Sequence, residues 1–248
     1  MDYHKEFMRT QNIASDFAKK FNEALLQVEG HFLGEQSKGV IRKLPRMHFL
    51  EPTVVEVKHE GEERNILVEE FLEGDYKKFN SNMGYVEKDV ADLVGRMNNL
   101  GLGGMGGGRI SNGLGAIVEG DSEEDSDSDE EEGDVENIFD SKESVPQGGS
   151  YRDLQDAYFP QAFSHFSYEK SKHMFMVVDL QGVFTINADG TKCYNLTDPV
   201  VHKNRKKKQQ ITKHWSFGRT DRGEKGMKAF FETHHCTDAC RILGLTET

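Results

Sequence analysis

A low-complexity segment between residues 101 and 150 divides the chain into two parts that must fold around it. Eight of the fifteen residues from 101 to 115 are glycine, and the run DSEEDSDSDEEEGD (121–134) contains ten acidic and no basic side chains. Such a segment buries too little apolar surface to offset the entropy that ordering would cost. We therefore expect residues 101–150 to be disordered. The glycine run indicates a linker rather than a phosphate-binding loop, because no Lys-Ser/Thr pair follows it.

The acidic run also accounts for most of the net charge. The 248-residue chain has a formal net charge of −12, which falls to −2 when the ten acidic residues of the run are left out. A nearly neutral remainder gives no reason to expect a nucleic-acid partner. The sequence contains no long apolar run and no apolar signal segment, and it has three cysteines. These features favour a cytoplasmic protein without a membrane segment.

Apolar spacing predicts the ordered elements on either side of the segment. Residues 7–28 have the period of an amphipathic helix, and residues 47–59 and 65–74 read as strands separated by a turn-rich EGEER. A second helix is expected at 85–100. Residues 173–186 read as one apolar strand, and NADG (187–190) predicts a hairpin over 183–197. The basic run 203–208 is expected in a loop, and residues 223–244 in one or two helices.

Polar residues interrupt the apolar strand in a way that needs an explanation. Asp179 and Gln181 lie within MVVDLQGV, and Asp198 follows the hairpin in NLTDPVVH. A buried carboxylate is costly unless something compensates its charge. Two carboxylates and an amide brought together by a hairpin would suit a magnesium site beside a general base. The alternative is that Asp179 caps a turn and Asp198 precedes a proline in an ordinary loop.

The C-terminal stretch THHCTDACRILGL (233–245) concentrates potential metal ligands. Cys236 and Cys240 are four residues apart, so a helix would place both thiols on one face. With His234 they offer three nitrogen and sulfur donors, one fewer than a closed zinc site requires. Two buried thiols on an amphipathic helix are the alternative interpretation, and a disulfide is the least favoured one.

Six motifs in order give the sequence a family resemblance. They are LVEEFLEGDYKKFNSNMGYV (67–86), PQAFSHFSYEKS (160–171), VVDLQGV (177–183), LTDPVVH (196–202), FGRTDRGEKGMKAFF (217–231) and HHCTDACRILGL (234–245). Together they resemble the α-kinase family of atypical Ser/Thr protein kinases. The resemblance implies an α+β, two-lobed atypical kinase fold with a zinc-stapled C-lobe, and an enzyme that transfers the γ-phosphate of ATP to Ser or Thr of protein substrates.

The resemblance also implies roles for individual residues. Asp179 corresponds to the catalytic carboxylate, and Gln181 and Asp198 to the Mg²⁺ ligands. The hinge that holds the nucleotide corresponds to Glu69, Glu70, Phe71 and Leu72, with Thr197 nearby and with Asn80, Ser81, Asn82 and Gly84 in the motif that follows. The glycine loop on the substrate side keeps Gly218, Gly223 and Gly226, whereas Thr220 and Asp221 replace the Gly and Asn of the family pattern. His165 completes a Zn²⁺ set with His234, Cys236 and Cys240.

By the same resemblance, the chain divides into a partial N-lobe with the hinge (1–72), the start of the C-lobe (73–100), the insert (101–150) and the remaining C-lobe with its zinc module (151–248). The first strands of the family's N-lobe, which carry an ATP-contacting lysine, have no counterpart here. The N-lobe is therefore expected to be incomplete. A pseudokinase or gene-model fragment that serves as a zinc-stabilised protein-binding module is the alternative function. The sequence gives no indication of the oligomeric state.

Overall fold

The structure, a computed structural model, describes residues 3–35, 43–59, 61–86, 154–204 and 217–247. Almost all of the predicted helix at 85–100, the segment 101–150 and most of the basic run 203–208 lie outside these residues. The described elements are α1 (Tyr3–Glu35), β1 (Arg46–Phe49), β2 (Thr53–His59), β3 (Glu62–Val68), β4 (Tyr76–Lys78), the 3-10 turn η2 (Asp156–Tyr158), α3 (Phe159–Lys170), β5 (Phe175–Val178), β6 (Gln181–Ile186), β7 (Lys192–Thr197), β8 (Val200–Lys203), α4 (Gly223–Thr233) and α5 (Asp238–Ile242).

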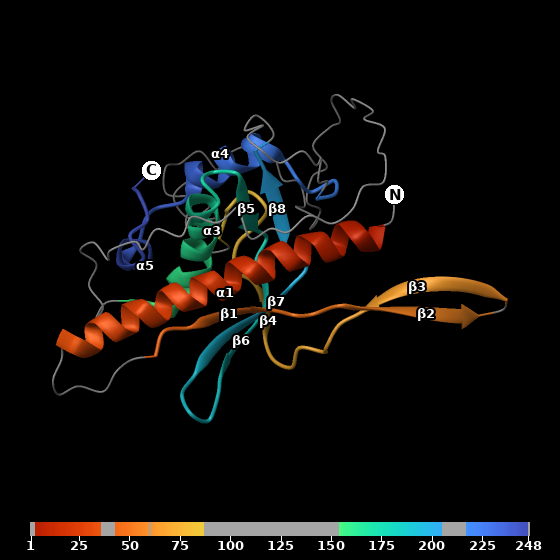
Figure 1. The fold of residues 1–248 in the computed structure, drawn as a ribbon, viewed down its shortest axis with the longest axis horizontal. Coiled ribbons are helices and arrows are strands. Elements are labelled where there is room, and N and C mark those ends of the chain that lie inside the picture. The colour runs from red at the N-terminus through yellow and green to blue at the C-terminus, as the bar shows by residue number, and fades with distance from the viewer. Residues whose placement is uncertain (1–2, 36–42, 60, 87–153, 205–216, 248) are drawn as a thin grey trace, which may run out of the picture.

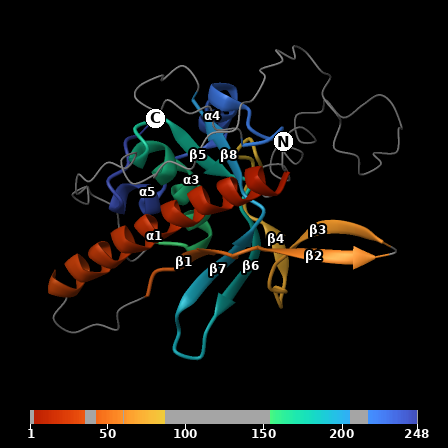
Figure 2. The same cartoon turned by 45° about the vertical axis from the view of Figure 1, so that its right-hand side comes forward.

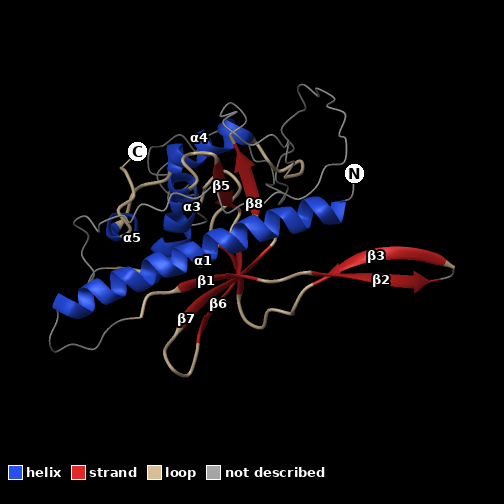
Figure 3. Ribbon diagram, in the orientation of Figure 1, coloured by secondary structure: helices blue, strands red, loops and turns tan. Residues whose placement is uncertain are grey.

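The strands form three separate sheets (Figure 3). The largest has the order β1-β7-β6-β4, β2 pairs with β3, and β5 pairs with β8. The hairpin predicted over 183–197 is confirmed, since β6 and β7 pair antiparallel from Gln181↔Thr197 to Ile186↔Lys192. Strand β1 joins β7 in parallel, with Arg46 opposite Cys193 and Phe49 opposite Leu196. The largest sheet therefore combines segments from both sides of the low-complexity insert.

The apolar strand predicted over 173–186 is not one strand. It divides into β5 and β6, which belong to different sheets. The break lies at Asp179, whose φ of 59° is in the left-handed region. This conformation turns the chain sharply and is tolerated by Asp better than by most residues. The turn directs β6 into the four-stranded sheet while β5 stays beside β8.

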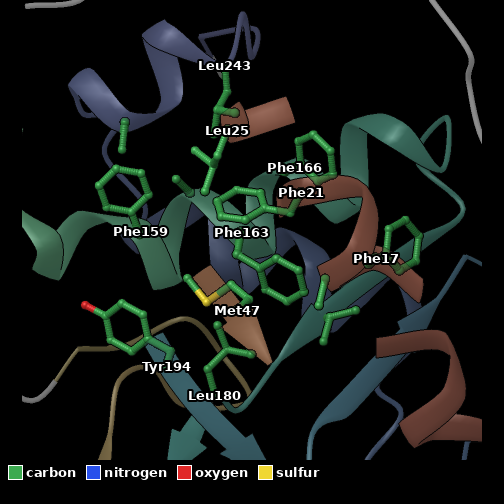
Figure 4. Packing of buried hydrophobic residues seen from close by; sticks show 14 of the residues in the cluster. Phe17, Phe21, Leu25, Met47, Phe159, Phe163, Phe166, Leu180, Tyr194 and Leu243 are labelled. Atoms are coloured by element: carbon green, nitrogen blue, oxygen red, sulfur yellow. The ribbon is translucent and has the colours of Figure 1, made fainter. Parts of the chain in front are cut away.

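A core rich in aromatic side chains holds these elements together (Figure 4). Helix α1 extends beyond the predicted range 7–28 at both ends, and its buried face packs on α3 and on the sheet. The ring of Phe21 lies edge-on to the rings of Phe163 and Phe166, with centroids 5.3 and 5.2 Å away. Such pairs add to the stabilisation that burial itself provides. Helix α1 and strand β1 thus share a core with elements after residue 154.

Side chains of helix α1 also form hydrogen bonds with backbone groups along the outer edge of β1 and beside its ends. The Asn22 side chain accepts a hydrogen bond from the Met47 N–H at 2.9 Å and donates one to the Met47 carbonyl at 2.8 Å. Glu29 accepts from the Leu44 N–H at 2.6 Å, and Gln11 donates to the Leu50 carbonyl. An edge strand otherwise presents unpaired backbone groups. Side chains of a helix here take the place of a further strand.

The β2–β3 ribbon has a different environment. Both views show it extending away from the rest of the molecule (Figures 1 and 2). All residues of β2 are exposed, and so are those of β3 except Leu67. The strand predicted over 47–59 divides into β1 and β2, which lie in different sheets. The strand predicted over 65–74 corresponds to β3, which begins earlier, at Glu62, and ends at Val68. Among the described helices, none has the length and apolar character needed to cross a membrane.

Candidate functional site

Three of the predicted site residues meet where strands end. Asp179 occupies the turn between β5 and β6, Gln181 opens β6, and Asp198 follows the last residue of β7. Gln181 lies opposite Thr197 in the hairpin, and its amide donates a 3.4 Å hydrogen bond to the Asp198 carbonyl. Asp198, like Asp179, has a positive φ, in this case 49°. The backbone thus presents two carboxylates from two left-handed turns beside one amide.

A lysine that the sequence interpretation did not single out joins this group. Lys78 of β4 lies opposite Gln181, and its ammonium is 2.6 Å from Oδ1 of Asp179. Tyr76 is two residues away on the same face of β4. Partial burial and the carboxylates of Asp198, Asp179 and Glu69 raise the pKa of Tyr76. The only signal for Lys78 in the sequence was its place in the motif at 67–86, because its pairing with β6 is not a local feature.

The surroundings of Asp198 affect its ionisation. Desolvation, followed by the charge of Asp179, raises the pKa of Asp198, while Lys78 acts in the opposite direction. A cation bound beside Asp198 would favour the ionised form of its carboxylate. Carboxylate and amide oxygens are ligands suited to Mg²⁺. The chemistry of Gln181 and Asp198 is therefore compatible with the predicted magnesium ion.

Four of the five predicted nucleotide-binding residues, Glu69 to Leu72, follow β3, and the fifth, Thr197, ends β7. They are not equally close to the carboxylates. Glu69 accepts a hydrogen bond from the Thr197 hydroxyl, which links the segment to the residue before Asp198. Glu70 is exposed, and 84% of the Phe71 surface is accessible. Leu72 is half-buried. The structure therefore brings Glu69 and Thr197 to the carboxylates, whereas Phe71 remains open to a ligand or another chain.

Residues of the NSNMG motif (80–84) form hydrogen bonds that hold the backbone next to the site in position. Oδ1 of buried Asn80 accepts a 2.9 Å hydrogen bond from the N–H of Leu180, the residue after Asp179. Its Nδ2 donates to the hydroxyl of Ser164 in α3 at 2.9 Å. The carbonyl of Asn82 lies 2.7 Å from Nε2 of buried His202. Asn80 therefore fixes the position of the turn that carries Asp179, a role that the motif alone did not reveal.

The predicted glycine loop packs against β8. Gly218 has a φ of 79°, and Gly223 begins α4. A Cβ on Gly226 would lie 2.3 Å from Nε2 of His202, so only glycine fits there. Asp221, which departs from the family pattern, accepts hydrogen bonds from the N–H groups of Lys203 at 3.0 Å and Gly223 at 2.8 Å. Asp221 thus organises the loop through backbone contacts.

The four predicted zinc ligands come together in a second cluster. Nε2 of His234 is 3.2 Å from Nδ1 of His165, 3.7 Å from Sγ of Cys236 and 3.6 Å from Sγ of Cys240. All four donor atoms lie within 4.8 Å of one another. Zinc bonds of about 2.0–2.3 Å place tetrahedral ligand atoms roughly 3.3–3.8 Å apart. The spacing of the donors therefore fits a closed tetrahedral zinc site.

The electrostatics of this cluster also suit a cation. Burial lowers the pKa of His234 to about 3, which leaves a neutral imidazole with a free lone pair at neutral pH. The hydrogen bond with Cys236, together with burial, raises the pKa of the Cys240 thiol. A thiolate there would face a second sulfur in a desolvated site. A bound metal cation is the usual means of compensating such a charge.

Local structure around the cluster differs from the sequence interpretation in two respects. Cys236 lies in the loop after α4, and only Cys240 is in α5, so the two thiols do not share one helical face. His165 is in α3, a helix that sequence patterns had not suggested, although Pro160 is suited to its first turn. The cluster consequently connects α3, the α4–α5 loop and α5.

Comparisons with known proteins agree with this architecture. Residues 1–97 and 139–240 match the family model described as the Alpha-kinase family. The chain is 24% identical over 241 residues to the alpha-protein kinase vwkA of Dictyostelium discoideum, covering 97% of this chain and 24% of that protein. It is 38% identical over 98 residues to the eukaryotic elongation factor 2 kinase of Mus musculus, covering 40% of this chain and 11% of that one.

The fold also resembles that of a solved alpha-kinase domain. The apoenzyme alpha-kinase domain of myosin-II heavy chain kinase A superposes with a TM-score of 0.52 at 22% identity, covering 98% of this chain and 58% of that one. The chain is thus shorter than the domains and proteins it matches. The family model nevertheless covers both sides of the insert. The chain belongs to the alpha-kinase family.

Proposed function

We propose that this chain contains the phosphoryl-transfer centre of an alpha-type Ser/Thr protein kinase. The proposal depends chiefly on one observation, the convergence of Asp179, Gln181, Asp198 and Lys78 at the ends of neighbouring strands. Phosphoryl transfer requires positioning and charge neutralisation more than covalent chemistry. This group offers a carboxylate for the acceptor hydroxyl and oxygen ligands for a cation. A related kinase domain has been solved with ATP and with ADP.

In the proposed mechanism, Asp179 orients the Ser or Thr hydroxyl of a protein substrate and accepts its proton. Gln181 and Asp198 would hold a Mg²⁺ ion, which would supply positive charge for the phosphates of ATP. Lys78 adds positive charge beside Asp179. Glu69 and Thr197 would lie beside the nucleotide next to Asp198. Residues 70–72 would contact the same nucleotide. The glycine loop around Gly218, Gly223 and Gly226 borders the substrate side.

We further propose that His165, His234, Cys236 and Cys240 bind one structural Zn²⁺ ion. The cluster fills all four tetrahedral positions with protein ligands, so it leaves no open position for catalysis. The distances between the four donor atoms support this proposal. A closed zinc site of this kind contributes directly to folding free energy.

The proposed transfer activity is tested with Asp179→Asn and Asp198→Asn, which keep the side-chain shape and remove the charge. Transfer of labelled γ-phosphate from ATP to Ser/Thr peptides should fall by about 10²–10⁴-fold in Asp179→Asn, the usual contribution of a general base. Mg²⁺-dependent ATP binding should persist in Asp179→Asn and weaken in Asp198→Asn. Isothermal titration calorimetry measures that difference.

The parent chain provides the decisive comparison with the non-catalytic alternative. A parent that binds Mg²⁺-ATP without transferring phosphate would be a pseudokinase. Full activity in Asp179→Asn would contradict the assignment of the base. The conservative change Asp75→Asn is the control, because Asp75 pairs with Lys77 at 2.7 Å and lies outside the group.

A further inference from the structure

The β2–β3 ribbon combines high exposure with a composition suited to a covered sheet. Isolated two-stranded hairpins are at best marginally stable in water, and they usually gain a third strand or a covering surface. Opposite residues of an antiparallel pair share a face, so the pairs Val55↔Ile66, Val57↔Arg64 and Thr53↔Val68 lie on the same side. This side carries four β-branched apolar side chains that are each 38–45% exposed: Val55, Val57, Ile66 and Val68.

The opposite face of the ribbon carries charged side chains beyond the pair Val54↔Leu67. The ammonium of Lys58 is 2.6 Å from the carboxylate of Glu63 and 3.8 Å from that of Glu56. Glu56 and Lys58 are two residues apart on β2, and both are exposed. One strand therefore displays a negative and a positive side chain in succession on the same face.

Backbone contacts show which edge of the ribbon is open. Nε2 of His4 is 3.0 Å from the carbonyl oxygen of Asn65, so this carbonyl points away from β2 and towards the N-terminal end of α1 (Figure 1). Asn65 pairs with Glu56, and the N–H and C=O groups of such a pair both point outward. Glu56, and likewise Val54 and Lys58, thus direct backbone groups to the outer edge of β2. Within the described residues, no strand lies beside that edge.

We propose that the outer edge of β2 pairs antiparallel with the same edge of a second copy of this chain, about a two-fold axis at Val57. This register sets Glu56 opposite Lys58 of the second copy, and the symmetry repeats the pair. Centring the axis on Glu56 would oppose two like charges, and centring it on Val55 would oppose Val54 to Glu56. Charge complementarity therefore selects the register at Val57.

The resulting sheet would have four strands in the order β3-β2-β2-β3. Its apolar side joins the two stripes of β-branched residues, and its charged side surrounds each Lys58 with carboxylates from both copies. Strand addition of this kind satisfies backbone groups that an open edge leaves to water. The surface acts independently of the proposed kinase activity.

A charge-reversal experiment tests the proposed register. Sedimentation velocity of the full chain over a concentration series should show a monomer–dimer equilibrium. Glu56→Lys and Lys58→Glu should each weaken association by about tenfold or more, because two favourable cross-strand pairs become unfavourable in each dimer. An equimolar mixture of the two variants should associate again, since their reversed charges are complementary. Glu62→Lys, the same charge change on β3, should leave the dissociation constant unchanged.

A cross-linking experiment gives an independent readout. In the proposed register the two copies of Val57 form a non-hydrogen-bonded pair with Cα atoms about 4.5 Å apart, which suits a disulfide. Val57→Cys should therefore form a covalent dimer on oxidation. Val55→Cys is the matched control, because Val55 has the same 38% exposure and lies on the same face, but its two copies would be about 13 Å apart along the strands.

Three results would overturn the proposal. They are a parent chain that stays monomeric throughout the concentration series, a dimer whose dissociation constant does not respond to either charge reversal, and equal cross-linking of the two cysteine variants. A ribbon covered by a strand of another polypeptide would give the first result. Circular dichroism of each variant checks that the overall secondary structure is retained.

Discussion

At the scale of single residues, the backbone conformation of two aspartates shapes the candidate site. Asp179 and Asp198 both have positive φ angles, which most side chains avoid. Each therefore lies on a sharp turn at a strand end. The Asp179 carboxylate pairs with Lys78, and the backbone carbonyl of Asp198 accepts a hydrogen bond from Gln181. Alanine at either position would combine a loss of charge with backbone strain. Asparagine tolerates the left-handed region, so it separates the two effects.

Lys78 should control the ionisation of Asp198. Its charge opposes the desolvation and the Asp179 repulsion that raise the pKa of Asp198, so Lys78→Met should raise this pKa further. Less of the carboxylate would then be ionised at a given acidic pH. The acidic limb of the pH profile of kcat/KM should consequently move to higher pH. Phosphate transfer measured across a pH series gives the position of the limb.

The neighbouring lysine is the control for this prediction. Lys77 pairs with Asp75 and lies on the other face of β4, so Lys77→Met should leave the acidic limb in place. A Lys78→Met variant that loses activity equally at all pH values would contradict the electrostatic role. It would instead indicate a purely structural contact between Lys78 and Asp179.

At the scale of elements, local sequence patterns predicted the helices and turns that depend on residues close together in the chain. Apolar spacing identified α1, and NADG identified the β6–β7 hairpin. The same reasoning failed for residues 173–186, because a left-handed Asp179 leaves no signature in hydropathy. It also failed for α3, whose buried face includes serines and a histidine as well as aromatic residues. The contact of Lys78 with Asp179 was inaccessible because it depends on long-range strand pairing.

The elements at the C-terminal end should depend on zinc. The proposed ion would connect α3, the α4–α5 loop and α5, so loss of one ligand should release α5 from the core. Cys240→Ser should therefore lose bound zinc and be partly unfolded or insoluble. Metal analysis of the purified chain, with each of the four single ligand variants beside it, should find one equivalent of zinc in the parent and none in the variants.

His235 provides a matched control beside the cluster. It is adjacent to the proposed ligand His234 and is not among the four clustered donors. His235→Ala should retain zinc and a melting temperature close to that of the parent. A parent that folds normally and contains no metal would rule out the proposed site.

At the scale of the whole molecule, the largest sheet joins distant parts of the chain. Strand β1 precedes the insert, β7 follows it, and the two pair in parallel over four residues. The family model likewise matches both sides and leaves residues 98–138 unmatched. The two flanks therefore form one folded unit. The assignment of residues 1–72 to a separate partial lobe stays a prediction, although α1 and β1 pack in the same core as α3.

Shortening the insert should have little effect on stability. The entropic cost of closing a loop changes by only about 0.6 kcal/mol for each doubling of its length. Deleting residues 101–138 should therefore leave the melting temperature nearly unchanged or slightly higher, and zinc content the same. Thermal unfolding followed by circular dichroism measures the change. A marked fall in the melting temperature would show that the deleted residues contribute to the folded core.

The parallel pairing of β1 with β7 has a consequence for the order of events on the ribosome. Because the chain is made from its N-terminus, β1 emerges well before the hairpin that completes its sheet, and the insert must be translated between them. Until then the apolar face of α1 lacks α3, and the edge of β1 lacks β7, the elements they contact in the folded chain. The apolar surface of the N-terminal part consequently stays uncovered by its native contacts until the hairpin has been made.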